Sequence, residues 1–87
     1  MNELIIDYYN KRFGENVNST FIHLVREIGE IALAIEKTNP EHAKLKITEA
    51  TALLQYIASK YDLDLEANMQ IIYTKKMNSL KTLGHKP

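Results

Sequence analysis

The chain has 87 residues, which predicts a single domain spanning residues 1–87. Its 11 basic and 11 acidic residues cancel and are interspersed, so no basic block can follow a phosphate backbone and we expect no nucleic-acid binding. The absence of cysteine excludes disulfides and thiolate metal sites, and leaves carboxylates and histidines as possible metal ligands.

The apolar segments of the chain are short. None approaches the roughly 18 residues of a membrane-spanning helix, and the first 13 residues carry acidic side chains and lack the apolar centre of a signal peptide. We therefore expect a cytoplasmic protein with no membrane partner.

The first half of the chain predicts two helices. The segment from Asn2 to Phe13 has apolar residues along one side, and Gly14 suits its C-terminal cap. After a polar loop, Asn18 or Ser19 can cap a second helix that ends near Lys37. Its apolar residues recur at helical spacing and predict a core-facing stripe: Phe21, Leu24, Val25, Ile28, Ile31, Ala32 and Ile35.

The second half predicts two further helices. Asn39 can serve as an N-cap with Pro40 at the first helical position, so a third helix can return antiparallel on the second as an αα-hairpin. Its predicted core positions are Ile47, Ala50, Leu53, Leu54, Ile57, Ala58 and Tyr61. Asp64 can cap a fourth helix from about Leu65 to Leu80, with Met69, Ile72 and Met77 inward, before a frayed tail from Gly84 to Pro87.

Two acidic residues of the second helix are candidates for chemistry. Glu27 and Glu30 lie three residues apart, so their carboxylates share one helix face and need a cation. The hairpin places Lys46 and Glu49 opposite them, and such a set could hold Mg²⁺. The alternative is a solvated surface where Lys46 forms weak salt bridges.

Other side chains are weaker candidates for a functional role. His23 is expected at the surface or the edge of the core, and the tyrosines are expected mainly in packing, although Tyr56 or Tyr73 could line a pocket for a base.

The motif around these acids resembles the MazG-like, all-α nucleoside triphosphate pyrophosphohydrolases. The segment from Leu24 to Ile31, LVREIGEI, is similar to the family's L-V-E-E-V-G-E-L with one charge reversal at Arg26. Residues 46–51 and 61–66 are similar to its E-L-A-D-V-L and L-G-I-D-L-E motifs, and residues 75–78 to its basic last motif. The resemblance covers residues 11–80.

The resemblance implies a metal held by E-x-x-E on one helix and E-x-x-D on the next. Glu27 and Glu30 match the first pair, as catalytic and metal-binding residues, and an ungapped register places Glu49 at the family's Asp position. That register puts Lys46 at the remaining Glu position. A gapped register, with Glu49 as the family's Glu, leaves Ala52 where the Asp should be, and we prefer the ungapped one because it keeps the third helix in phase.

The sequence therefore predicts an all-α, MazG-like fold, four helices around a central antiparallel hairpin, assembling as a homodimer or higher oligomeric bundle. The implied function is a Mg²⁺-dependent hydrolase that converts a nucleoside triphosphate to the monophosphate and pyrophosphate, with activity reduced by the altered motif. The implied ligands are Glu27, Glu30 and Glu49 for the metal, and Lys46, Lys76 and Asn78 for the substrate. The alternative is a non-catalytic helical dimer that binds a nucleotide or a protein.

Overall fold

The computed structural model describes residues 2–83, and the tail expected at Gly84 to Pro87 lies outside them. The described residues form helices without a β-strand, which confirms the all-α class. The four helices are α1 (Glu3–Phe13), α2 (Val17–Glu36), α3 (Pro40–Ser59) and α4 (Leu65–Thr82). None of these helices, within residues 2–83, is apolar over enough length to cross a bilayer.

Three of the predicted helix boundaries are confirmed by their caps. Gly14 ends α1 in the left-handed conformation, with φ 57°. Asn39 accepts a hydrogen bond from the His42 amide at 3.2 Å and Pro40 opens α3. The Asp64 side chain accepts from the Ala67 amide at 3.1 Å at the start of α4.

The predicted start of α2 is wrong by two or three residues. The N-cap is Asn16, whose side-chain oxygen accepts a hydrogen bond from the Ser19 amide at 3.0 Å, and neither Asn18 nor Ser19 has this role. Gly14 and Glu15 both adopt positive φ, so the turn out of α1 is complete after two residues and α2 begins early.

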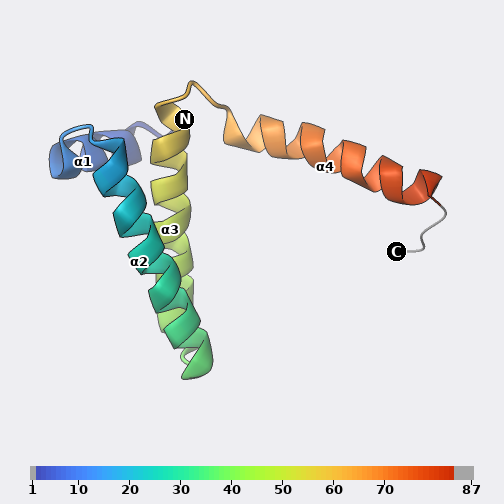
Figure 1. Ribbon diagram of the computed structural model, residues 1–87. Coiled ribbons are helices and arrows are strands. Elements are labelled where there is room, and N and C mark those ends of the chain that lie inside the picture. Colours follow the sequence, from blue (N-terminus) through green and yellow to red (C-terminus); the bar gives the residue numbers. More distant parts are fainter. Residues whose placement is uncertain (1, 84–87) are drawn as a thin grey trace.

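The two long helices α2 and α3 lie side by side and antiparallel, and α1 packs at their end away from the hairpin turn (Figure 1). The core forms where α1, α2 and α3 meet, and its buried members are Tyr9, Leu24, Ala50, Leu53 and Tyr56. Leu53 and Tyr56 are both 0% exposed. The centre of the core therefore lies on α3.

A polar contact fixes α1 on α3 beside this core. The Tyr56 hydroxyl donates to the side-chain oxygen of Asn10, and the Lys60 ammonium donates to the same oxygen at 3.0 Å. Lys60 also lies 3.3 Å from a carboxylate oxygen of Glu15. Tyr56 is fully buried in packing, so the expectation that it could line a pocket for a base is wrong.

Helix α4 leaves the far end of α3 and points away from the hairpin (Figure 1). Within the described chain it has no buried residue, and the expected inward positions Met69, Ile72 and Met77 are 46%, 46% and 47% exposed. The Cα radius of gyration is 16.2 Å, against about 12 Å for a compact domain of this length. The four helices therefore do not form a compact unit within the single chain, and the expectation that Met69, Ile72 and Met77 face inward is wrong there.

The apolar stripe of α2 is also only partly covered. Leu24 is buried against α3, but Phe21, Val25 and Ile28 are 52–56% exposed and Ile35 is 63% exposed. The buried face of α2 follows a neighbouring line through Thr20, Leu24, Glu27 and Ala34. A single neighbouring helix is too narrow to cover a stripe this broad, so α2 keeps an exposed apolar face.

Candidate functional site

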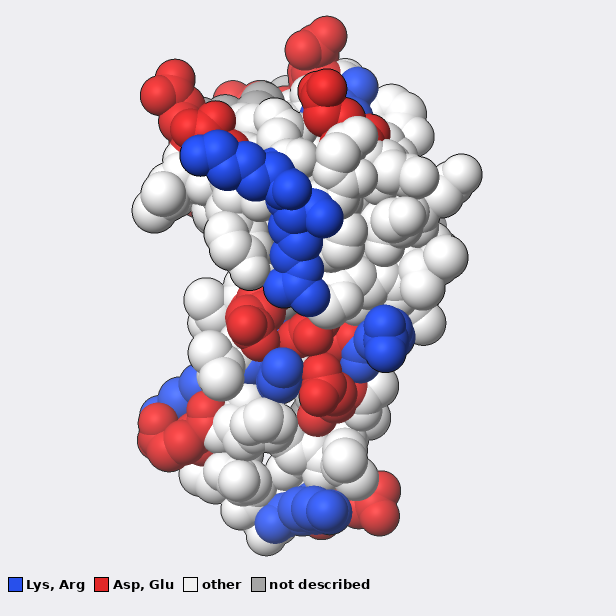
Figure 2. All heavy atoms as spheres, turned by 90° about the vertical axis from the view of Figure 1, so that its left-hand side faces the viewer, with Lys and Arg blue, Asp and Glu red and all other residues white. Residues whose placement is uncertain are grey.

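The four residues predicted to face one another across the hairpin are brought together. The Lys46 ammonium nitrogen lies 3.3 Å from Glu27 Oε2, 3.3 Å from Glu30 Oε2 and 3.1 Å from Glu49 Oε1. We call these four residues the Glu–Lys cluster. Figure 2 shows acidic and basic side chains gathered near the middle of one face of the molecule.

Helix geometry explains why these residues meet. Glu27 and Glu30 lie about one turn apart on α2, and Lys46 and Glu49 have the same spacing on α3. The connection between the helices is short because Thr38 adopts a positive φ of 51°, which turns the chain sharply before Asn39 caps α3. Two pairs equally distant from a tight turn therefore face each other.

The carboxylates of the cluster differ in burial. Glu27 is 5% exposed, whereas the side chains of Glu30 and Glu49 are 47% and 43% exposed. Glu27 Oε2 and Glu49 Oε1 are buried oxygens at ion-pair distance from Lys46, but neither has the alignment of a hydrogen bond. Glu27 thus forms the floor of the cluster and the other two carboxylates form its rim.

These differences change the ionisation of the cluster. Burial raises the pKa of Glu27, although the Lys46 ammonium opposes that shift. The same ammonium lowers the pKa of Glu30. The carboxylates, Glu49 first, raise the pKa of Lys46, so the lysine is charged at neutral pH.

His23 joins the site at its buried end. Its Nε2 lies 3.6 Å from Glu27 Oε1, and its ring packs near the ring of Phe13, with 5.5 Å between centroids. The sequence prediction gave His23 no role in the site. The signal that could have found the contact was the i, i+4 spacing of His23 and Glu27 on one helix.

The predicted metal ligands surround an ammonium group. Among residues 2–83, no group of three or more His, Cys, Asp or Glu side chains is arranged to hold a metal ion. Glu27, Glu30 and Glu49 converge, as the spacing around the hairpin turn predicts, but they do so on Lys46 Nζ. The chemistry of the site therefore depends on whether Lys46 keeps its contacts with the three carboxylates.

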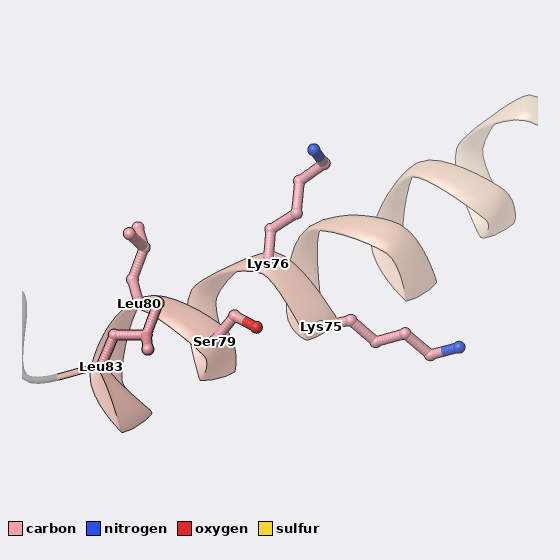
Figure 3. A pocket seen from close by; sticks show the side chains of 5 residues that line it. All are labelled: Lys75, Lys76, Ser79, Leu80 and Leu83. Carbon is pink, nitrogen blue, oxygen red and sulfur yellow. The ribbon is translucent and has the colours of Figure 1, made fainter.

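The two other predicted substrate-binding residues lie elsewhere. Lys76 and Asn78 belong to α4, which points away from the hairpin, so one protomer does not bring them to the Glu–Lys cluster. Figure 3 shows Lys76 extending from α4, and the pocket that it lines is formed by residues of this helix and its C-cap residue. The residues that line the pocket are Lys75, Lys76, Ser79, Leu80 and Leu83.

The fold and the site together define an all-α protein whose central helical hairpin carries a cluster of three carboxylates and one lysine. Comparisons with protein-family models, with curated proteins and with solved structures give no match for this chain. Membership of the MazG-like family therefore stays a prediction from the motifs.

Proposed function

We propose that this chain is a MazG-like nucleoside triphosphate pyrophosphohydrolase of the cytoplasm, with reduced activity. The observation that supports this most is the convergence of Glu27 and Glu30 from α2 with Glu49 from α3. The resemblance implies that carboxylates from two antiparallel helices meet at one point. The reaction would consume one water and cleave the anhydride between the α- and β-phosphates, which releases a monophosphate and pyrophosphate.

The donor chemistry of the cluster suits Mg²⁺. Hard carboxylate oxygens are the ligands this ion prefers, and Glu27 Oε2 and Glu49 Oε1 are buried without hydrogen-bond partners. Glu27, Glu30 and Glu49 would hold the ion, which when bound would neutralise phosphate charge and lower the pKa of a water. Lys46 has to leave their centre for this, which is the reason we expect reduced activity.

The residues of the cluster would then have different roles. Glu27 is buried and would anchor the site, while the partly exposed Glu30 and Glu49 can reach a substrate. Glu30 lies at the partly exposed rim of the cluster, which suits it to orient the attacking water. The ammonium of Lys46, once released, would pair with a phosphate oxygen.

We assign the protein to a homodimer or larger homo-oligomer. In the single chain, α4 exposes Met69, Ile72 and Met77, and α2 exposes Phe21 and Ile28. Packing of α4 from one protomer against the hairpin of another would cover both apolar surfaces. It would also supply Lys76 and Asn78 to substrate at the partner's cluster.

A specific observation favours the alternative of a non-catalytic helical dimer that binds a nucleotide or a protein. Lys46 contacts all three carboxylates, which gives the cluster a charge partner without metal. If the lysine never leaves, binding without hydrolysis is the remaining function.

The experiment that tests the proposal incubates the protein with canonical and modified nucleoside triphosphates and Mg²⁺, and measures pyrophosphate and monophosphate. We expect both products in equal amounts for at least one nucleotide. Glu30→Gln should abolish both, because a neutral amide weakens metal binding with little change in volume. Glu41→Gln is the matched control, since Glu41 lies on α3 with its side chain 83% exposed. No turnover of any nucleotide would favour the non-catalytic alternative.

A further inference from the structure

Lys46 lies at the centre of the Glu–Lys cluster, in contact with all three carboxylates. Its nitrogen lies within 3.3 Å of three carboxylates from two helices, and its side chain is only 16% exposed. The attraction between an ammonium and a carboxylate depends on the distance between the charges, so one lysine can pair with three carboxylates without an aligned hydrogen bond to each. The lysine therefore occupies the place where an exogenous cation would connect α2 to α3.

We propose that the Lys46 ammonium is the resident cation of this protein, and that it connects the two helices without a bound metal. The inference concerns the free protein, and it stands whether or not the chain hydrolyses nucleotides. It assigns part of the stability of the hairpin to an internal ion-pair network, and it makes Lys46 a competitor of any divalent ion for the same oxygens.

The distances support the lysine as the occupant. Separations of 3.1–3.3 Å are typical of ammonium–carboxylate contacts, whereas Mg²⁺ requires oxygens at about 2.0–2.1 Å. Within residues 2–83 no group of three or more His, Cys, Asp or Glu side chains is arranged to hold a metal ion, and in the Glu–Lys cluster the ammonium lies between the carboxylates. A metal can therefore enter only where Lys46 gives up its contacts.

The burial of Glu27 makes this network necessary. A carboxylate that is 5% exposed needs a compensating charge, since burying an unpaired ion is costly. Lys46 lies 3.3 Å from Glu27 Oε2, and the other basic group at ion-pair distance, His23, lies 3.6 Å from Oε1. Loss of the lysine leaves Glu27 with a histidine, which is charged only when protonated.

The same charges explain what happens when the lysine is removed. The three carboxylates and one ammonium leave an excess of two negative charges when all four are ionised. Without the ammonium the excess rises to three, and the centre of the cluster becomes free for a cation. The stability of a lysine-free variant should therefore depend on a divalent ion, whereas we expect the stability of the natural protein to be independent of it.

The test compares thermal unfolding, followed by circular dichroism, with EDTA and with Mg²⁺. We expect the natural protein to give the same midpoint in both. Lys46→Gln should unfold at a lower temperature in EDTA and recover at least part of the loss with Mg²⁺. Calorimetric titration with Mg²⁺ should show at least about tenfold tighter binding to Lys46→Gln than to the natural protein.

Two further variants complete the design. Lys44→Gln is the matched control, because Lys44 also pairs with a glutamate on α3 but its side chain is 73% exposed, and it should resemble the natural protein in both buffers. The double variant Glu27→Gln with Lys46→Gln removes the buried charge too, so it should be more stable than Lys46→Gln in EDTA and respond less to Mg²⁺. If Lys46→Gln does not fold, the double variant can still be compared with the natural protein in EDTA and in Mg²⁺.

Two results would overturn the proposal. One is a rise of the midpoint with Mg²⁺ that is as large for the natural protein as for Lys46→Gln. The other is an unchanged midpoint of Lys46→Gln in EDTA. Both outcomes concern unfolding and metal binding alone, so they are distinct from the absence of nucleotide hydrolysis.

Discussion

The exposed apolar face of α4 predicts that the protein self-associates, and the accessible surface gives the scale. The chain exposes 6892 Å², whereas a compact monomer of 10.0 kDa exposes about 5,200 Å². The excess is about 1,700 Å² for each protomer. A dimer that buried it on both sides would remove about 3,400 Å² from water, which falls in the range of obligate homodimers.

The perturbation that tests this is Ile72→Asp, at a side chain that is 46% exposed in the single chain. Complete burial of an isoleucine contributes about 1.5–3 kcal/mol, so burying the remaining half contributes about 1 kcal/mol per copy. Two copies in a symmetric dimer lose about 2 kcal/mol, before the cost of burying the new carboxylate is counted. We therefore expect dissociation to be at least about 30-fold easier.

Sedimentation velocity over a dilution series measures the effect. The natural protein should sediment as a dimer or larger species at micromolar concentration, and Ile72→Asp should dissociate at higher concentration. Ala67→Asp is the control, because Ala67 is exposed and lies on the side of the same helix away from Met69 and Ile72. A 10 kDa species for the natural protein, or equal weakening by both variants, would refute the reasoning.

Three further changes test the packing and the charges. Leu53→Ala removes a side chain that is 0% exposed, so it should lower the free energy of unfolding, measured by urea denaturation, by about 2–5 kcal/mol. A change near zero would contradict the position of Leu53 at the centre of the core. Tyr56→Phe removes the hydroxyl that donates to Asn10 and should cost about 1 kcal/mol, since Asn10 keeps its bond from Lys60. Lys46 holds the pKa of Glu30 below its ordinary value of 4.5, so the stability from this carboxylate is present above that value and is lost as the pH falls through the lower folded pKa. Acid unfolding should therefore lose part of its pH dependence in Glu30→Gln, and an unchanged acid profile would contradict the pairing.

The sequence predicts helix boundaries well where one residue type has a single suitable position. Gly14 adopts positive φ, and Asn39 and Asp64 cap the helices that follow them, as their side chains require. The start of α2 was mispredicted because Asn16 and Asn18 have the same capping chemistry. The choice between them depends on how many residues complete the turn after α1, which composition does not reveal.

The Glu–Lys cluster was predictable because helix spacing and a short turn fix which residues face each other. The burial of Glu27 was not predictable, since it depends on which edge of α2 lies against α3. The exposure of α4 and of the stripe on α2 has a related cause. Hydrophobic periodicity identifies an apolar face, but it does not reveal whether the same chain or another copy covers that face.

The measurement that tests the proposed function most directly is phosphorus NMR of a nucleoside triphosphate incubated with Mg²⁺ and either the natural protein or Lys46→Glu. The substitution removes the ammonium from the three carboxylates and supplies a fourth, so Mg²⁺ should bind more tightly. We expect both proteins to release monophosphate and pyrophosphate in equal amounts, faster with Lys46→Glu, so the signal of the two equivalent pyrophosphate phosphorus atoms should be twice that of the monophosphate. Orthophosphate as the product, or no turnover by either protein, would contradict the assignment of the cluster as a pyrophosphohydrolase site.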